Sequence, residues 1–294
     1  MAKFLYAGKN CLITGGSSGI GLALAKELAA KNANVWILAR SADKLQSALK
    51  EIQALRQSET QKFGCFTVDV ADHKAVTDMV NACIQANGAP DILINSAGIS
   101  HPGYAQDLSP DIYRHLMEVN YLGMVYITKA FLPAMLQRQS GCIINISSMA
   151  GYIGAFGYSA YSGSKFAMTG FSESLRAEMK PHGIQVSIAF PPETDTPMLI
   201  YENPLMPMET KALGEGSGRM SSEAVARAIL KGMERRQFRI LPGGEAKFYY
   251  RISSIFNEAM NWYADMIVAG VKKRKSRDKN HENLKDSTAK SDLV

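Results

Sequence analysis

The 294-residue chain is 46% hydrophobic and 20% charged, which is typical of a globular core and excludes a disordered chain, a collagen and a coiled coil. Its apolar runs stop short of the ~18 residues of a membrane-spanning helix, and its first residues hold too short an apolar patch for a signal peptide. The net charge is +6, but residues 272–294 contain eight Lys or Arg and four Asp or Glu, so most of it belongs to this tail.

Short apolar runs alternate with longer segments of helical periodicity along most of the chain. Strands are predicted at residues 10–14, 34–39, 63–69, 91–95, 142–147, 185–190 and 238–241. Helices are predicted at residues 19–31, 42–57, 73–87, 111–137, 158–180 and 221–235. The alternation predicts an α/β fold, in which a doubly wound parallel sheet of about seven strands carries helices on both faces.

Three parts of the chain differ in composition. Residues 1–244 are expected to form one domain, which includes a long loop at 191–218 that is rich in Pro, Gly, Met and Glu. Loops of this length in compact domains are usually functional or mobile. Residues 245–271 are predicted to form an extra, amphipathic C-terminal helix. Residues 272–294 lack the apolar content to pack and are predicted to be disordered.

The cysteines and histidines indicate a reducing compartment and no metal site. The four cysteines form no C-x-x-C pair, and most lie in apolar runs, so we expect free, buried thiols in a cytoplasmic protein. The five histidines are scattered and give no zinc signature.

A glycine-rich turn, Thr14-Gly15-Gly16-Ser17-Ser18-Gly19-Ile20-Gly21, joins the first predicted strand to the first helix. Glycine lets backbone amides approach a pyrophosphate, and a helix N-terminus adds partial positive charge. A plain tight turn is the alternative, but a strand before and a helix after it favour nucleotide binding. The predicted contacts are Gly15, Ser17, Ser18, Gly19, Ile20 and Gly21.

The second predicted strand ends at Arg40, where an NAD site normally carries an acidic residue for the ribose hydroxyls. A guanidinium can instead pair with a 2′-phosphate, and Lys44, one helical turn further, can join it. Ser41 is a third candidate contact. A solvated Arg at a strand end is the alternative, but we predict NADPH as the cofactor.

The next two strands end in residues suited to the rest of a dinucleotide. Asp69 and Val70 close the third strand and are predicted to cap the adenine. Asn95, Ala97 and Gly98 close the fourth, where small residues allow the cofactor to lie across the carboxyl ends of the strands.

Tyr161 and Lys165 are four residues apart in a predicted helix and share one face. A nearby ammonium favours the phenolate and lowers the pKa of a tyrosine from about 10. Tyr161 can then give a proton to a carbonyl oxygen as hydride reaches the carbon. The alternative is an aromatic side chain packed beside a surface lysine.

Two further polar residues accompany this pair. Ser148 follows an apolar strand and can polarise a substrate carbonyl, whereas Ser147 is the alternative hydroxyl at that strand end. Asn120 lies inside a predicted helix, where Asn is a poor helix former. It either marks a helix kink or anchors a water beside Lys165.

These motifs, in this order, resemble the short-chain dehydrogenase/reductase family over residues 5–240. They are T-G-x-x-x-G-I-G, N-x-A-G, the mid-helix Asn, I-x-S-S and Y-x-x-x-K. The resemblance implies a Rossmann-type fold and the catalytic residues Asn120, Ser148, Tyr161 and Lys165. One departure is Pro191-Pro192-Glu193-Thr194-Asp195-Thr196-Pro197, where the family commonly has Pro-Gly.

That departing segment, with Arg40 and Lys44, resembles the 3-ketodihydrosphingosine reductases, which reduce the 3-keto group of a long-chain amino ketone with NADPH. Pro191 is expected to stiffen the chain beside the nicotinamide, with Thr194 and Thr196 in contact with the cofactor. The Met-rich loop that follows suits an alkyl chain, and Glu193 or Asp195 can offset a substrate ammonium. A mobile loop that only covers the core is the alternative.

Residues 245–271 carry apolar side chains at helical spacing, followed by a basic run at 272–275. With Trp262 and Tyr263, they fit an interfacial helix beside anionic lipid, so peripheral contact with the cytoplasmic face of a membrane is one prediction. A subunit interface, or a helix packed on the domain, fits equally well. We also expect a homo-oligomer.

Three other functions compete with reduction of a sphingoid ketone. A reductase of 3-oxoacyl thioesters or another hydrophobic ketone would use the same catalytic residues. A non-catalytic NADP-binding regulator would have no need of Ser148, Tyr161 and Lys165 together. Nucleic-acid binding would rest on the tail alone, whose mixed charge and lack of aromatics argue against it, so no nucleic-acid partner is expected.

Overall fold

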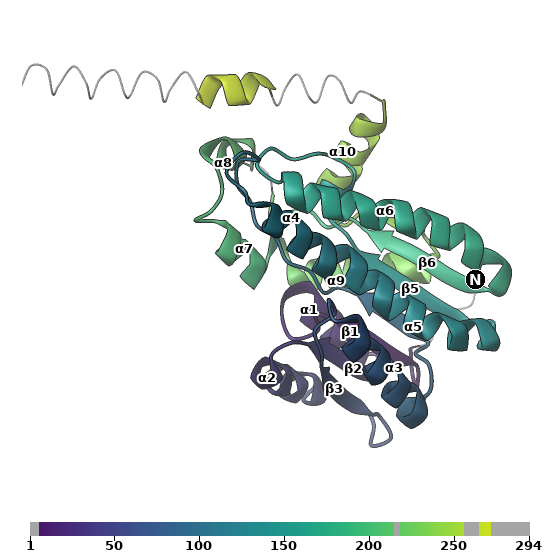
Figure 1. The fold of residues 1–294 in the computed structure, drawn as a ribbon. Helices are drawn as coiled ribbons and strands as arrows, with labels where there is room; N and C mark the ends of the chain where they lie inside the picture. The colour runs from purple at the N-terminus through teal and green to yellow at the C-terminus, as the bar shows by residue number, and fades with distance from the viewer. Residues whose placement is uncertain (1–5, 215–217, 256–264, 272–294) are drawn as a thin grey trace, which may run out of the picture.

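A computed structural model of the chain describes residues 6–214, 218–255 and 265–271. Its main sheet has seven parallel strands in the order β3-β2-β1-β4-β5-β6-β9 (Figure 1). The strands are β1 (Asn10–Thr14), β2 (Asn34–Ala39), β3 (Phe63–Thr67), β4 (Ile92–Asn95), β5 (Gly141–Ile146), β6 (Ile184–Ala189) and β9 (Arg239–Ile240). The predicted doubly wound parallel sheet is confirmed.

Helices cover both faces of the sheet, because the central strands are apolar on both faces. On one face lie α1 (Gly19–Ala29), α2 (Ala42–Gln53) and α9 (Ser222–Glu234). On the other lie α3 (His73–Asn87), α4 (Pro110–Leu116), α5 (Gly123–Arg138) and α6 (Ser159–Met179). Their apolar sides form two buried clusters, one on each side of the sheet, and these hold the strands in place.

The strand order reverses between β1 and β4, because the chain leaves β3 and returns to pair with the other side of β1. In open α/β sheets the carboxyl ends of the strands beside such a reversal border the ligand crevice. The glycine-rich turn after β1 and the segment after β4 therefore lie next to each other.

The predicted helix at 111–137 is interrupted. Between α4 and α5 the chain widens into a π-helical turn, η1 (Met117–Leu122), which contains Asn120. The stretch Pro110–Arg138 is long and apolar enough to cross a membrane, the one such stretch among the described residues. Its side chains Ile127 and Phe131 are fully buried in the apolar cluster on that face of the sheet, as in the core helix of a globular domain.

The predicted long loop at 191–218 contains regular structure. It holds β7 (Thr194–Asp195), α7 (Pro197–Glu202) and α8 (Met208–Gly214), and β7 pairs with β8 (Met220–Ser221). Thr196 caps α7 by accepting a hydrogen bond from the Leu199 amide, and Pro197 occupies the first helical turn. The segment was predicted as a loop because these helices are too short to show a periodic pattern.

The first part of the C-terminal segment packs on the domain. Helix α10 spans Gly243–Ile255, and residues 265–271 are also helical. The Tyr250 ring lies 5.1 Å from the Tyr152 ring, and Tyr152 donates a hydrogen bond to the Ala246 carbonyl. Trp262, Tyr263 and the tail at 272–294 lie outside the described residues.

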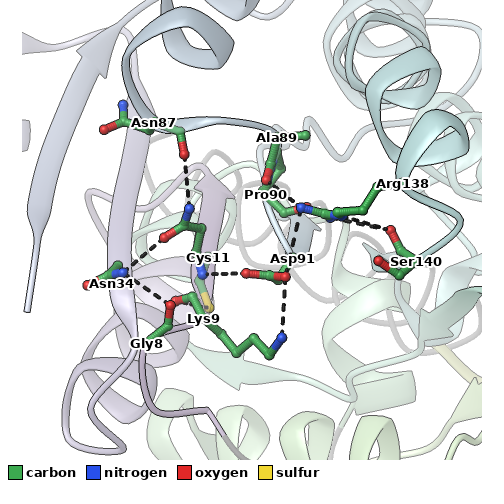
Figure 2. A network of polar contacts seen from close by, with 11 residues as sticks. Gly8, Lys9, Cys11, Asn34, Asn87, Ala89, Pro90, Asp91, Arg138 and Ser140 are labelled. Atoms are coloured by element: carbon green, nitrogen blue, oxygen red, sulfur yellow. Dashed lines mark hydrogen bonds and ion pairs between the residues drawn. The ribbon is translucent and has the colours of Figure 1, made fainter.

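Asp91 gathers a polar network at the amino edge of the sheet (Figure 2). Its carboxylate accepts a hydrogen bond from the Asn10 amide at 2.9 Å and pairs with Lys9 and Arg138. Asn10 in turn contacts Asn34, at the start of β2. The network joins the starts of β1, β2 and β4 to the end of α5.

Candidate active site

A pocket of about 520 Å³ lies at the carboxyl edge of the sheet. That volume is in the range of cofactor and small-molecule sites. Most of the predicted site residues line it: Gly15, Ser17, Ser18, Gly19, Ile20, Gly21, Arg40, Lys44, Asp69, Val70, Ala97, Gly98, Ser148, Tyr161, Lys165, Pro191, Thr194 and Thr196. The structure therefore brings residues from seven segments of the chain into one cavity.

The glycine-rich turn fits a dinucleotide. Gly15 has φ +67°, and a Cβ atom there would lie 2.8 Å from the Ala97 Cα, so only glycine suits this position. Ser18 precedes the first turn of α1, but its side chain makes no capping hydrogen bond. The first amides of α1 border the pocket without a side-chain acceptor, as a pyrophosphate site requires.

The end of β2 provides positive charge at the rim of the same pocket. The Arg40 guanidinium lies 4.0 Å from the Asp69 carboxylate, and both side chains are about half exposed. Asp69 also accepts a hydrogen bond from the Ala71 amide, which fixes its turn. Lys44 lines the pocket in the first turn of α2, where its amide donates to the Ser41 hydroxyl.

Asn95 is the predicted cofactor contact whose side chain the structure does not bring into the pocket. Its amide nitrogen donates to the Thr128 hydroxyl and to the Asn145 side-chain oxygen, at 3.0 and 2.8 Å. The side chain is buried beneath the pocket floor, where it ties β4 to α5 and β5. Ala97 and Gly98, which follow it, form the floor itself.

Tyr161 and Lys165 lie on one face of α6, directed at the end of β5. The Tyr161 hydroxyl shares a hydrogen bond with the Ser148 hydroxyl. Lys165 is buried, and its ammonium donates to the Ile146 carbonyl at 3.0 Å and lies 5.5 Å from the centre of the Tyr161 ring. Ser147 instead donates to the Lys165 carbonyl, so Ser148 is the hydroxyl that faces Tyr161.

The electrostatics of this pair differ from the prediction. Removal of its hydroxyl from water raises the pKa of Tyr161, the Glu202 carboxylate raises it further, and the hydrogen bond with Ser148 opposes both. Burial also lowers the pKa of Lys165 to about 7. The predicted lowering of the tyrosine pKa is therefore wrong here, because desolvation and the Glu202 carboxylate outweigh the hydrogen bond with Ser148.

Asn120 lies behind the pocket floor, in the π-helical turn. Its side chain exchanges two hydrogen bonds with the Ile99 backbone and donates a third to the Ser164 hydroxyl. A Cβ atom on Gly98 would come within 3.2 Å of the Asn120 oxygen and 3.5 Å of the Lys165 nitrogen. Asn120 is therefore both the site of a helix distortion and a polar anchor, and π-turns often occur at functional sites.

The segment after β6 closes the other side of the pocket. A Cβ atom on Gly19 would lie 3.1 Å from the Thr196 methyl group, so this segment reaches across to the glycine-rich turn. Thr194 is buried and donates to the Pro192 carbonyl. Glu193 forms an ion pair with Arg219, and Asp195 is exposed.

The comparisons with known proteins agree with this geometry. The family model described as short chain dehydrogenase matches residues 9–205, about two thirds of the chain. The chain belongs to the short-chain dehydrogenase family. It is thus an oxidoreductase that acts on a keto or hydroxyl group, and the family uses NAD or NADP.

Individual proteins resemble most of this short-chain dehydrogenase in sequence or in structure. A 3-dehydrosphinganine reductase of Danio rerio is 43% identical over 76% of this chain and 68% of its own. A 3-ketodihydrosphingosine reductase of Bos taurus is 38% identical over 84% of this chain and 74% of its own. The crystal structure of a short-chain dehydrogenase/reductase from Burkholderia phymatum in complex with NAD shares the fold, with a TM-score of 0.76, 22% identity, and coverage of 87% and 96%.

Two site residues of this short-chain dehydrogenase escaped the sequence analysis. Tyr158 precedes α6, and its ring lies 5.9 Å from the Tyr161 ring. Its hydroxyl donates to the Glu202 carboxylate at 3.0 Å. Glu202 ends α7 and is only 7% exposed. In the sequence, Glu202 stands out as the single acidic residue within the apolar run Met198 to Met208. That its side chain lines the pocket becomes evident only from the fold.

Proposed function

We propose that this protein reduces the 3-keto group of 3-ketodihydrosphingosine to the alcohol, with NADPH as the coenzyme. The observation that carries the proposal is the Tyr161 hydroxyl, hydrogen-bonded to Ser148, in a pocket that also holds the glycine-rich turn. Relatives at 38–43% identity bear the names of 3-dehydrosphinganine and 3-ketodihydrosphingosine reductases.

The preference for NADPH is supported by charge at the end of β2. Arg40 and Lys44 line the pocket where the adenosine ribose would lie, and a forked guanidinium suits a 2′-phosphate. Asp69 is close to Arg40, and it orients the guanidinium at the rim. The amides of the turn after β1 would hold the pyrophosphate. When bound, the coenzyme supplies hydride to the ketone carbon.

Tyr161 is the proposed proton donor. Its raised pKa keeps the phenol protonated at neutral pH, so it can donate a hydrogen bond, and then the proton, to the substrate oxygen. Ser148 donates to the same oxygen and stabilises the charge that develops there. Lys165 holds the ribose of the nicotinamide and, when protonated, favours loss of the phenolic proton. Asn120 positions the loop after β4 beside Lys165.

The decisive experiment follows loss of NADPH absorbance with 3-ketodihydrosphingosine and with an acetoacetyl thioester, side by side. The sphingoid ketone is expected to be turned over with a higher kcat/KM. Turnover of the thioester alone would assign the protein to the 3-oxoacyl reductases, and turnover of neither would favour a non-catalytic role.

We also propose contact with the cytoplasmic face of a membrane, from which a long-chain ketone is delivered. The support is a set of exposed apolar side chains on α7, α8 and α10: Ile200 is 77% exposed, Met208 58% and Phe248 60%. Figure 1 shows α8 and α10 at the upper end of the molecule and α7 below α8 on its left side. The triple change of Ile200, Met208 and Phe248 to Ser should abolish pelleting with anionic liposomes, and unchanged pelleting would refute this contact. A homo-oligomer stays a prediction.

A further inference from the structure

One acidic side chain in the pocket has no ionic partner among the residues that the structure describes. Glu202 is more than nine-tenths buried, and it lines the pocket together with Tyr161 and Ser148. None of the ion pairs among the described residues includes it. A buried, unpaired carboxylate is costly, so its presence beside reacting groups calls for a partner.

Glu193 and Lys165, two other charged residues that line the pocket, are already engaged. Glu193 pairs with Arg219, and the Lys165 ammonium is directed at the Ile146 carbonyl. Within the described part of the chain, the donors to Glu202 are neutral hydroxyl groups, and the Tyr158 hydroxyl at 3.0 Å belongs to the residue whose ring contacts Tyr161. Glu202 therefore lines the pocket as a carboxylate that no cation among the described residues neutralises.

We propose that Glu202 forms a subsite for a primary ammonium group on the carbon next to the substrate ketone. The inference rests on the proposed function, which supplies a 2-amino ketone as the substrate class. In such a ketone the nitrogen is attached to the carbon beside the carbonyl. The residue that binds the ammonium must therefore lie close to Tyr161 and Ser148, whose hydroxyls hold the carbonyl oxygen. Tyr158 links Glu202 to Tyr161 at this range.

The same carboxylate connects recognition to proton transfer. Glu202 raises the pKa of Tyr161, after the larger effect of desolvation, and burial raises the pKa of Glu202 itself. A bound ammonium offsets the negative charge of Glu202 and so makes the Tyr161 phenol a better acid. A ketone without the amine gains neither the ion pair nor this acidification.

The test compares two substrates with wild type and Glu202→Gln. The substrates are 3-ketodihydrosphingosine and the 1-hydroxy-3-ketone of the same chain length that lacks the amine. Wild type is expected to favour the amino ketone, and Glu202→Gln to lower its kcat/KM by roughly 30-fold, as for a lost hydrogen bond to a charged group. The kcat/KM for the amine-free ketone should change less than about 3-fold.

The matched control is Asp195→Asn, which removes an exposed carboxylate from the same segment and should preserve the substrate ratio. An equal loss for both ketones in Glu202→Gln, or collapse of the ratio in Glu193→Gln instead, would overturn the inference. Wild type alone gives a second test, because equal kcat/KM for both ketones overturns the inference while leaving the reductase intact. Reduction of neither ketone would overturn the proposed function and the subsite with it.

Discussion

The two edges of the sheet are built from opposite kinds of residue. At the amino edge, Asp91 collects an amide and two cations, and Asn10 and Asn34 pair their side chains, so the polar groups satisfy one another (Figure 2). At the carboxyl edge, glycines and the bare start of α1 leave donors without protein acceptors. An edge whose polar groups hydrogen-bond to one another stabilises the fold, whereas an edge with unpaired hydrogen-bond donors is suited to bind a ligand.

The contrast predicts that substitutions at the two edges affect different properties of the protein. Substitutions at the carboxyl edge should alter turnover or coenzyme choice more than stability, and substitutions at the amino edge should do the reverse.

The largest effect is expected for Tyr161→Phe, which removes the proposed proton donor and keeps the ring. Turnover should fall roughly 1,000-fold, in the range of general acid catalysis, while NADPH binding measured by fluorescence changes little. Tyr113→Phe, which changes a half-buried tyrosine on α4 that contacts Ser159, is the control. Near-normal turnover in Tyr161→Phe would end the proton-donor role.

Coenzyme choice is the next largest effect. Arg40→Asp replaces a phosphate partner with a repelling charge beside Asp69, so the ratio of kcat/KM for NADPH to that for NADH should fall about 100-fold. Lys44→Ala should move the ratio the same way by less. If Arg40→Asp leaves the ratio unchanged, the 2′-phosphate is held by other residues.

Lys165 is expected to make the unfolding free energy of the coenzyme-free protein depend on pH. Its pKa is about 7 in the folded chain and near 10.5 in the unfolded one, so the unfolded chain binds more protons between these values. Lys165 therefore makes unfolding free energy rise with pH in this window, by up to about 1.4 kcal/mol per pH unit. Lys165→Met should flatten that rise in urea titrations, while the exposed Lys231→Met should keep it.

The smallest effect belongs to the amino edge. Asp91→Ala leaves the Asn10 amide and two cations without their acceptor and should cost roughly 1–2 kcal/mol of unfolding free energy. Asp78→Ala, which breaks an exposed pair with Lys74, should cost less than about 0.5 kcal/mol. The folded Asp91→Ala protein should keep wild-type kcat/KM, and a selective loss of turnover would break the division between the edges.

Much of the site followed from motifs in which one residue type is required. Gly15 is needed for its positive φ, and the spacing of Tyr161 and Lys165 places them on one helix face, so local rules are enough to place all three at the pocket. Asn95 shows the limit of such rules. A polar residue at a strand end can point into the pocket or beneath it, and neighbouring Thr128 and Asn145 draw this one beneath.

The sequence by itself determined the alternation of strands and helices, the glycine-rich turn and the order of the catalytic motifs, because these depend on spacing within short segments. Only the tertiary structure decided that Glu202 faces the pocket, that α7 and α8 occupy the predicted loop, and that desolvation raises the pKa of Tyr161. The burial of Tyr161 on α6 and the charge of Glu202 on α7 act together on one pKa, although the two helices are far apart in the chain. A local sequence pattern does not predict that these helices come into contact.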